Sequence, residues 1–320
     1  MSKKKKESEK WKKERSRRLL YASVCVVVLV AVIGFLFYAW YTQVPAVSGK
    51  LWSLDSIGKL SFGDRGRIDG NAGPVENNGN YTVEKVVYKS FGDDVYALLR
   101  KPSNVTKPPV VIVLPAATIT KEKDEATANA LCDMGYASLT LDVRGNGGET
   151  GGYWVGNWSL GYKDFLAGGD PGQYKQIYDV LKGLDYVRSR PDLDGNNVAL
   201  LGESIGGMLA IVSAGEEPGF KGVITISSCD FDYVGGDDPK AAEFVNAVMP
   251  SRYLENIPPR KLAMFQFDGD TFVTADQGKA LFDNASEPKA WHLYNGTTHG
   301  LYDKTYDADL RVELKGMLGR

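Results

Sequence analysis

One serine in the chain has the surroundings that a catalytic nucleophile requires. Ser204 is the central residue of a G-x-S-x-G pattern at residues 202–206. An apolar run at 198–201 precedes the pattern, and apolar residues at helical spacing follow it. On so sharp a strand-to-helix turn a serine exposes its hydroxyl above a sheet, and the flanking glycines remove side chains that would clash. We therefore predict that Ser204 is a nucleophile.

A serine hydroxyl is a weak nucleophile and needs a base, and the sequence contains two histidines. His292 lies inside a predicted strand at 290–294, where packing against the sheet is the expected role. His299 follows that strand in a predicted loop. Open α/β sheets place their sites in loops at the carboxyl ends of strands. His299 is therefore the predicted base.

A catalytic histidine in turn needs a carboxylate that fixes its tautomer and stabilises the imidazolium. The segment after the predicted strand 262–267 supplies two candidates, Asp268 and Asp270. Asp270 lies farther beyond the strand end and has a valine three residues later, so it is preferred, with Asp268 as the alternative. Asp230 and Asp232, which follow another predicted strand, are a more distant choice. The chain order serine, aspartate, histidine is the α/β-hydrolase order.

The negative charge that develops on an attacked carbonyl oxygen needs two hydrogen-bond donors. The first expected donor is the backbone N–H of Ile205, where the predicted helix begins. The second is expected from Ala116 or Ala117, in the loop after the apolar run 110–114. This chemistry requires no metal and no organic cofactor, and the cysteines and histidines show no metal-ligand spacing.

The elements that must position these groups alternate between strands and helices. Strands are predicted at 81–88, 94–100, 110–114, 137–141, 198–201, 222–227, 262–267 and 290–294. Helices are predicted at 123–134, 174–188, from 205 onward, 275–284 and 308–318, and 238–257 is mixed. Such alternation predicts an α/β fold with a mostly parallel sheet. The first two strands are joined at 90–93 as a hairpin, which predicts an antiparallel N-terminal edge.

The N-terminus has the pattern of a membrane anchor. Residues 1–18 contain 10 Lys and Arg against 3 Glu, and the 22 residues from Leu19 to Trp40 contain no charge. At about 1.5 Å per residue, this stretch is long enough to cross a bilayer. A basic flank favours a cytoplasmic N-terminus with the rest of the chain outside. A buried core helix and a signal peptide cleaved near Val44-Pro45-Ala46 are the alternatives.

We therefore predict four parts: a basic cytoplasmic tail (1–18), a transmembrane helix (19–41), a stalk (42–80) and a catalytic domain (81–320). Residues 19–320 carry 28 Lys and Arg against 37 Asp and Glu, a net charge of −9. An acidic external domain is a poor nucleic-acid binder. Cys132 and Cys229 fall in predicted core elements and are expected to be buried free thiols.

Residues 81–320 resemble the α/β-hydrolases, in the branch of the dienelactone hydrolases, acetyl-xylan esterases and prolyl-oligopeptidase-like enzymes. The resemblance rests on D-x-R-G-x-G at 142–147, the approach to the nucleophile at 190–194, the elbow itself, residues 250–257 and the T-H-G sequence at 298–300. Two departures affect the site. Pro115-Ala116 stands where these enzymes have His-Gly, which concerns the oxyanion geometry. The spacing to the acid is shortened to Gly269-Asp270, which concerns the choice of aspartate.

The leading hypothesis is a membrane-anchored, extracytoplasmic serine hydrolase, most simply a carboxylesterase that forms an acyl-enzyme. A serine peptidase is the alternative that the resemblance implies. A non-catalytic envelope protein that uses the same fold for binding is the second alternative. The expected ligand is a small ester or peptide. Nothing in the sequence identifies the acyl group, the leaving group or the oligomeric state.

Overall fold

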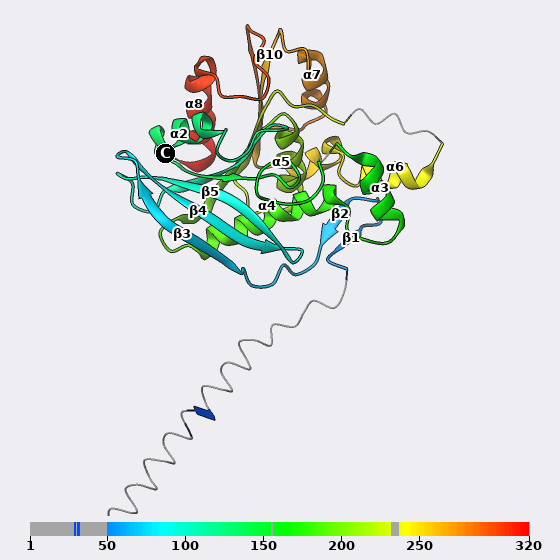
Figure 1. Ribbon diagram of the computed structural model, residues 1–320. Helices are drawn as coiled ribbons and strands as arrows, with labels where there is room; N and C mark the ends of the chain where they lie inside the picture. The colour runs from blue at the N-terminus through cyan, green and yellow to red at the C-terminus, as the bar shows by residue number, and fades with distance from the viewer. Residues whose placement is uncertain (1–28, 30, 33–49, 155, 232–236, 320) are drawn as a thin grey trace, which may run out of the picture. The chain divides into compact units, whose positions relative to one another are not determined.

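The computed structural model describes residues 50–154, 156–231 and 237–319, together with Leu29, Ala31 and Val32 (Figure 1). The chain divides into two compact units, Met1–Lys50 and Leu51–Arg320, and the second is the subject here. The predicted tail and membrane span lie outside the described residues, apart from the three named, which are helical. Among the residues that are described, no helix is long and apolar enough to span a bilayer.

The second unit is built on one large sheet. Its strands are β3 (Gly70–Asn77), β4 (Tyr81–Ser90), β5 (Asp93–Pro102), β6 (Pro109–Leu114), β7 (Ala137–Leu141), β8 (Asp194–Glu203), β9 (Gly222–Ile226), β10 (Lys261–Phe267) and β11 (Lys289–Tyr294). In the described part of the chain they are ordered β11-β10-β9-β8-β6-β7-β5-β4-β3. Pairing is antiparallel from β3 to β7 and parallel from β7 to β11. The predicted fold class, a mostly parallel sheet with an antiparallel N-terminal edge, is confirmed.

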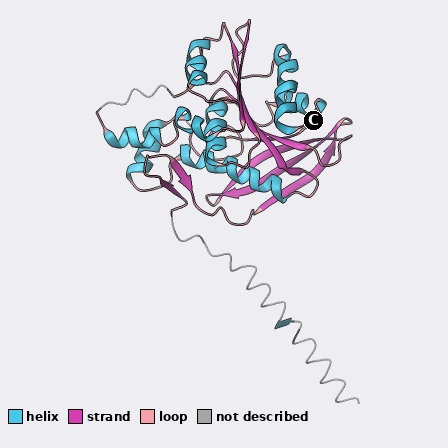
Figure 2. Ribbon diagram, turned by 180° about the vertical axis from the view of Figure 1, so that it is seen from behind, coloured by secondary structure: helices cyan, strands magenta, loops and turns pink. Residues whose placement is uncertain are grey.

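Helices pack on both faces of this sheet (Figures 1 and 2). They are α2 (Glu125–Asp133), α3 (Trp158–Leu166), α4 (Gly172–Ser189), α5 (Ile205–Glu216), α6 (Pro239–Asn246), α7 (Ala275–Asp283) and α8 (Asp307–Leu318), with short 3₁₀ helices η1 (Pro250–Asn256) and η2 (Lys304–Tyr306). Alternate residues of β6 face opposite cores. Ile112 packs in the core that contains α4 and α5, and Val113 in the core that contains α2 and α8. Burial on both faces explains why the central strands are unbroken apolar runs.

Residues 51–80, most of the segment predicted as a stalk, lie within the described part of the chain. From Leu51 onward the chain belongs to the compact unit. β1 (Trp52–Leu54) pairs with β2 (Leu60–Phe62), and β3 pairs with β4 at the sheet edge. The Trp52 ring packs on Tyr174 of α4, with 4.8 Å between ring centroids. Every residue of β3 is exposed, so backbone pairing rather than an apolar pattern defines this strand.

Cys132 in α2 and Cys229 after β9 are both buried and free, as predicted. Burial raises the pKa of the Cys132 thiol to about 12, so that it stays protonated at neutral pH. A protonated thiol in a core behaves as a small apolar side chain. The Cys132 thiol is therefore not expected to act as a nucleophile.

Candidate active site

Ser204 occupies the turn between β8 and α5. Its φ is 52°, a left-handed conformation, and its N–H donates to Ile226 O at 2.8 Å, which ties the turn to β9. A Cβ atom at Gly206 would lie 1.9 Å from Leu114 O, and one at Gly202 would lie 2.2 Å from Gly206 O. The backbone of α5 therefore approaches β6 so closely that only glycine fits on either side of the serine.

His299 connects the serine to a carboxylate. Its Nε2 lies 2.9 Å from Ser204 Oγ, and its Nδ1 lies 2.8 Å from Asp270 Oδ2. An ionised carboxylate only accepts hydrogen bonds, so the proton belongs on Nδ1. Nε2 is then an acceptor, and the Ser204 hydroxyl donates to it. The three side chains come from loops after β8, β10 and β11, whose carboxyl ends meet at one edge of the sheet.

Of the two candidate aspartates, Asp270 is the one that contacts His299. The carboxyl of Asp270 is fully buried, and its Oδ1 accepts the N–H groups of Phe272 at 2.9 Å and Val273 at 3.2 Å. Its other oxygen is thereby aimed at the imidazole. Asp268 has a different task, because its Oδ1 accepts the N–H of Gly296 at 3.0 Å. It braces the loop that leads to His299.

The remaining sequence candidates lie elsewhere. His292 on β11 packs edge-on against Phe265 at 4.7 Å, and its Nε2 lies 3.0 Å from Glu313 Oε1, so it packs on the sheet as predicted. Asp230 Oδ1 accepts the N–H of Ser251 at 3.2 Å. Asp232 falls outside the described residues.

The serine and histidine can be reached from solvent. Ser204 is 8% exposed, and the His299 side chain is 22% exposed. The Phe272 ring is 80% exposed and lies 5.0 Å from the imidazole, centroid to centroid. An exposed aromatic ring therefore lies beside the imidazole of His299.

The loop after β6 lies beside the nucleophile, because β6 pairs with β8 and Leu114 is opposite Gly202. In this loop the Ala116 N–H faces the carboxyl of Glu203, which favours the charged form of that carboxyl. Within the described residues, the N–H groups of Ala117 and Ile205 have no hydrogen-bond partner. These two amides are therefore available to bind an oxyanion.

Gly300 separates the nucleophile from the β6 loop. Its φ is 54°, and a Cβ atom there would lie 3.0 Å from Ser204 Cβ and 3.2 Å from Ala116 Cβ. We expect Gly300→Ala to lower kcat about tenfold or more by displacing these groups, and to destabilise the fold by about 1–3 kcal/mol through the positive φ. Ester kinetics and thermal unfolding measure the two effects.

The matched control for this change is Gly92→Ala in the β4–β5 hairpin. Gly92 has a φ of 79° and no atom within 4 Å of an added Cβ. An alanine at position 92 has the same unfavourable positive φ but no contact with Ser204. Equal kcat losses in the two variants would contradict a steric effect at the site.

Two acidic side chains are buried directly behind the nucleophile. Glu203 is fully buried and Asp124 is 3% exposed, and the Thr127 hydroxyl donates to Glu203 Oε1 at 2.7 Å. Burial, reinforced by the neighbouring Asp124, raises the pKa of Glu203 well above its ordinary value. Burial also raises the pKa of Asp124 to about 7. Buried Arg100 favours the charged form of Asp124, and burial, reinforced by the two carboxyls, raises the pKa of Tyr306.

This pair makes stability depend on pH. The folded chain holds protons on these carboxyls that the unfolded chain releases near pH 4, so their contribution falls between about pH 4 and pH 7 as pH rises. We expect Asp124→Asn to make the free energy of unfolding fall less between pH 5 and pH 8 in urea denaturation, although Glu203 keeps a pKa raised by its own burial. Asp133→Asn, an exposed position at the end of α2, is the control. An unchanged pH dependence in Asp124→Asn would contradict a raised pKa of Asp124 in the folded chain.

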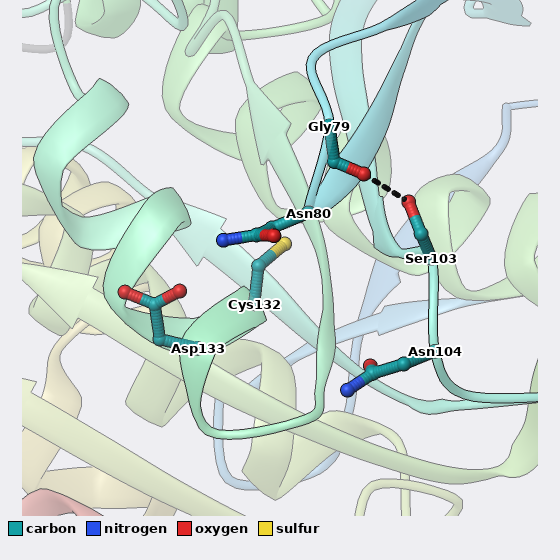
Figure 3. A pocket seen from close by; sticks show the side chains of 6 residues that line it. All are labelled: Gly79, Asn80, Ser103, Asn104, Cys132 and Asp133. Carbon is teal, nitrogen blue, oxygen red and sulfur yellow. Dashed lines mark hydrogen bonds between the residues drawn. The ribbon is translucent and has the colours of Figure 1, made fainter.

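A cavity that is separate from Ser204, His299 and Asp270 lies elsewhere in the catalytic unit (Figure 3). It has a volume of about 380 Å³ and is lined by Gly79, Asn80, Ser103, Asn104, Cys132 and Asp133. None of Ser204, Asp270 and His299 lines it. Across the described ranges, no group of three or more His, Cys, Asp and Glu side chains could hold a metal ion.

Fold and geometry together define the class: an α/β-hydrolase in which serine, histidine and aspartate form one hydrogen-bonded chain. A family model described as acetyl xylan esterase (AXE1) matches residues 76–236, half of the sequence. The chain belongs to the acetyl xylan esterase family, and the resemblance inferred from the sequence is confirmed.

Curated relatives match parts of the chain. The chain is 30% identical over 132 residues to the acetyl esterase Axe7A of Xylanibacter ruminicola, covering 39% of this chain and 30% of that protein. Across three curated relatives, the matched segment spans between 28% and 58% of the relative's length.

Solved structures show the same fold. An acetyl xylan esterase from Paenibacillus sp. R4 superposes with a TM-score of 0.66 at 19% identity, covering 78% of this chain and 89% of that one. A glucuronoyl esterase from Solibacter usitatus superposes with a TM-score of 0.59 at 16% identity, covering 80% and 88%.

Proposed function

We propose that this protein is a carboxylesterase that works through an acyl-enzyme on Ser204. The observation that carries the proposal is the position of His299, within 2.9 Å of Ser204 Oγ and 2.8 Å of the Asp270 carboxylate. Membership of the acetyl xylan esterase family supports an ester rather than an amide as the substrate. The names of its relatives favour an acetyl ester among carboxylic esters.

In the proposed reaction, His299 Nε2 takes the hydroxyl proton as Ser204 Oγ attacks the acyl carbon. Electrons of the C=O bond move to its oxygen, and two backbone N–H groups bind the resulting oxyanion. The intermediate collapses, and the departing alcohol takes the proton from Nε2. Water then attacks the acyl-enzyme by the same steps, which releases the acid and restores Ser204. Asp270 stabilises the imidazolium that forms in each half.

We assign the oxyanion donors to Ile205 and Ala117. Ile205 is the first residue of α5, where N–H groups lack helical partners and the helix dipole is positive. Ala117 takes precedence over Ala116 because the Ala116 N–H faces Glu203. The assignment predicts two donors converging beside Ser204, from β6 on one side and α5 on the other.

A fluorophosphonate probe and an ester panel test this function. The full chain should be labelled at Ser204, and acetyl, butyryl and octanoyl p-nitrophenyl esters together with a prolyl anilide should rank its substrates. We expect the acetyl ester to be fastest and the anilide slowest. Labelling with the opposite ranking would favour the peptidase, and no labelling would favour the non-catalytic binding protein.

We further propose that residues 19–41 anchor the enzyme in a membrane with the catalytic unit on the outer side. The support is the sequence: 22 uncharged residues follow a segment of 10 Lys and Arg and 3 Glu. Protease added to intact cells or spheroplasts should remove the catalytic unit while a tag before Lys3 stays protected. A digested tag with a surviving catalytic unit would reverse the orientation. A free protein beginning near Val47 would identify a signal peptide.

A further inference from the structure

One side chain from the loop after β7 holds the loop that follows β6. Asn146 is 6% exposed. Its Nδ2 donates to Ala116 O and to Ile119 O, both at 2.9 Å, and its Oδ1 accepts the N–H of Thr118 at 2.6 Å. The side-chain amide has four hydrogen-bonding positions. Three of them are therefore used on a single four-residue turn.

These bonds fix the peptide group between Ala116 and Ala117. The carbonyl of that peptide accepts both Asn146 Nδ2 and, at 3.1 Å, the N–H of Ile119. In a trans peptide the carbonyl and the N–H point in opposite directions, so the Ala117 N–H points away from Asn146. Thr118 has a φ of 66°, which is costly for a β-branched residue. Its N–H bond to Asn146 holds it there.

Asn146 is itself on a rigid support. Arg144, two residues earlier, is 3% exposed and forms two bonds of 2.9 Å to the Asp179 carboxylate on α4. Asp142 at the start of the same loop accepts both the backbone N–H and the Nζ of Lys121, at 2.9 and 2.7 Å. The loop is thus fastened to α4 on one side and to the far end of the β6 loop on the other.

The peptide that Asn146 holds is next to the nucleophile. An added Cβ at Gly300 would touch Ala116 and Ser204 alike, at 3.2 and 3.0 Å. We propose that Asn146 is a positioning residue for ester hydrolysis, which sets the Ala116–Ala117 peptide so that the Ala117 N–H binds the oxyanion. The proposal rests on the function proposed above for Ser204. This role of Asn146 differs from a purely structural one because it affects the stability of the transition state and not only the stability of the fold.

Asn146→Asp is the sharpest variant, because it keeps the shape and the Oδ1 acceptor for Thr118. In place of Nδ2 it puts an oxygen that repels Ala116 O and Ile119 O. With p-nitrophenyl acetate we expect kcat to fall about 100-fold and KM to change less than about threefold. Inhibition by a trifluoromethyl ketone, whose adduct with serine carries an oxyanion, should weaken by a similar factor. Inhibition by acetate, which forms no adduct with Ser204 and so creates no oxyanion, should not change.

Asn197→Asp is the matched control. Asn197 Nδ2 donates to Asp194 Oδ2 at 3.0 Å near the start of β8, away from the site. The control makes the same chemical change and loses a side-chain hydrogen bond, so its melting temperature falls while kcat and trifluoromethyl ketone inhibition stay at wild-type values. A fall in kcat in this control as large as in Asn146→Asp would overturn the proposal.

The outcomes separate the two proposals. A wild-type chain that hydrolyses no ester and takes no fluorophosphonate overturns the function of Ser204. An active wild type with an equally active, folded Asn146→Asp overturns only the role of Asn146. Asn146→Ala, in which water can reach the freed groups, replaces the aspartate variant if that variant does not fold. Unfolding of both at a temperature where Asn197→Asp is folded would assign Asn146 a structural role instead.

Discussion

Replacing Ser204 with alanine is expected to lower kcat for ester hydrolysis by about six powers of ten. The Ser204 hydroxyl is the group that would form the bond to the acyl carbon. Among the described residues, Ser204 Oγ makes one hydrogen bond, to His299 Nε2. The positive φ of 52° is unfavourable for alanine and serine alike, because both carry a Cβ atom, so the exchange adds little backbone strain. The melting temperature should therefore stay within a few degrees of wild type, because a single partly exposed hydrogen bond is lost.

Kinetics with p-nitrophenyl acetate, fluorophosphonate labelling and thermal unfolding on one preparation check this expectation. The labelled serine should disappear together with the activity. A folded variant that keeps more than one hundredth of the wild-type kcat would remove Ser204 from the mechanism, since replacing a serine that takes no part in catalysis lowers kcat only slightly.

The second large effect is expected for Asp270→Asn, with a loss of about four powers of ten in kcat. The side-chain oxygen of the new asparagine is held by the N–H groups of Phe272 and Val273, so its NH₂ group faces His299 Nδ1. Two donors cannot share that contact. The imidazole therefore shifts its proton to Nε2 and can no longer accept the proton of Ser204.

Asp268→Asn is the control for this tautomer effect. An asparagine oxygen can still accept the N–H of Gly296, so the brace of the loop survives. We expect kcat within about threefold of wild type, because a neutral acceptor replaces a charged one at a partly exposed site. Comparable losses in the two variants, or a larger loss in Asp268→Asn, would transfer the role from Asp270.

Sequence patterns predicted the parts of the fold that depend on burial. The strand predicted at 137–141 has the observed bounds, because apolar residues end abruptly at Gly135 and Asp142. The exposed β3 gave no such pattern, since its pairing with β4 uses only backbone groups. Alternation of burial is a property of side chains. An edge strand that buries none of them leaves no periodicity to detect.

The candidate site shows the same division. The G-x-S-x-G pattern and the position of His299 after a strand predicted residues that the structure places in contact. The choice between Asp268 and Asp270 depends on which carboxylate the β11 loop approaches, and that is a tertiary relation. Asn146 was visible as part of D-x-R-G-x-G, but its three bonds to the neighbouring loop join segments about 30 residues apart. In the sequence, Glu203 is only the variable residue before Ser204 in the G-x-S-x-G pattern, which gives no sign of its burial.

The place of β11 in the sheet has a consequence for how activity is lost. β11 is the last strand of the sheet, paired only with β10 in the described chain, and Leu293 in it is 52% exposed. Edge elements with few buried contacts open at lower free energy than central strands do. A fluctuation that frees β11 carries His299 away from Ser204 while β6 and β8 stay packed. Inactivation in mild denaturant should therefore precede the loss of helical circular dichroism. The range of denaturant concentration over which the enzyme is active is then narrower than the range over which most of the chain stays folded.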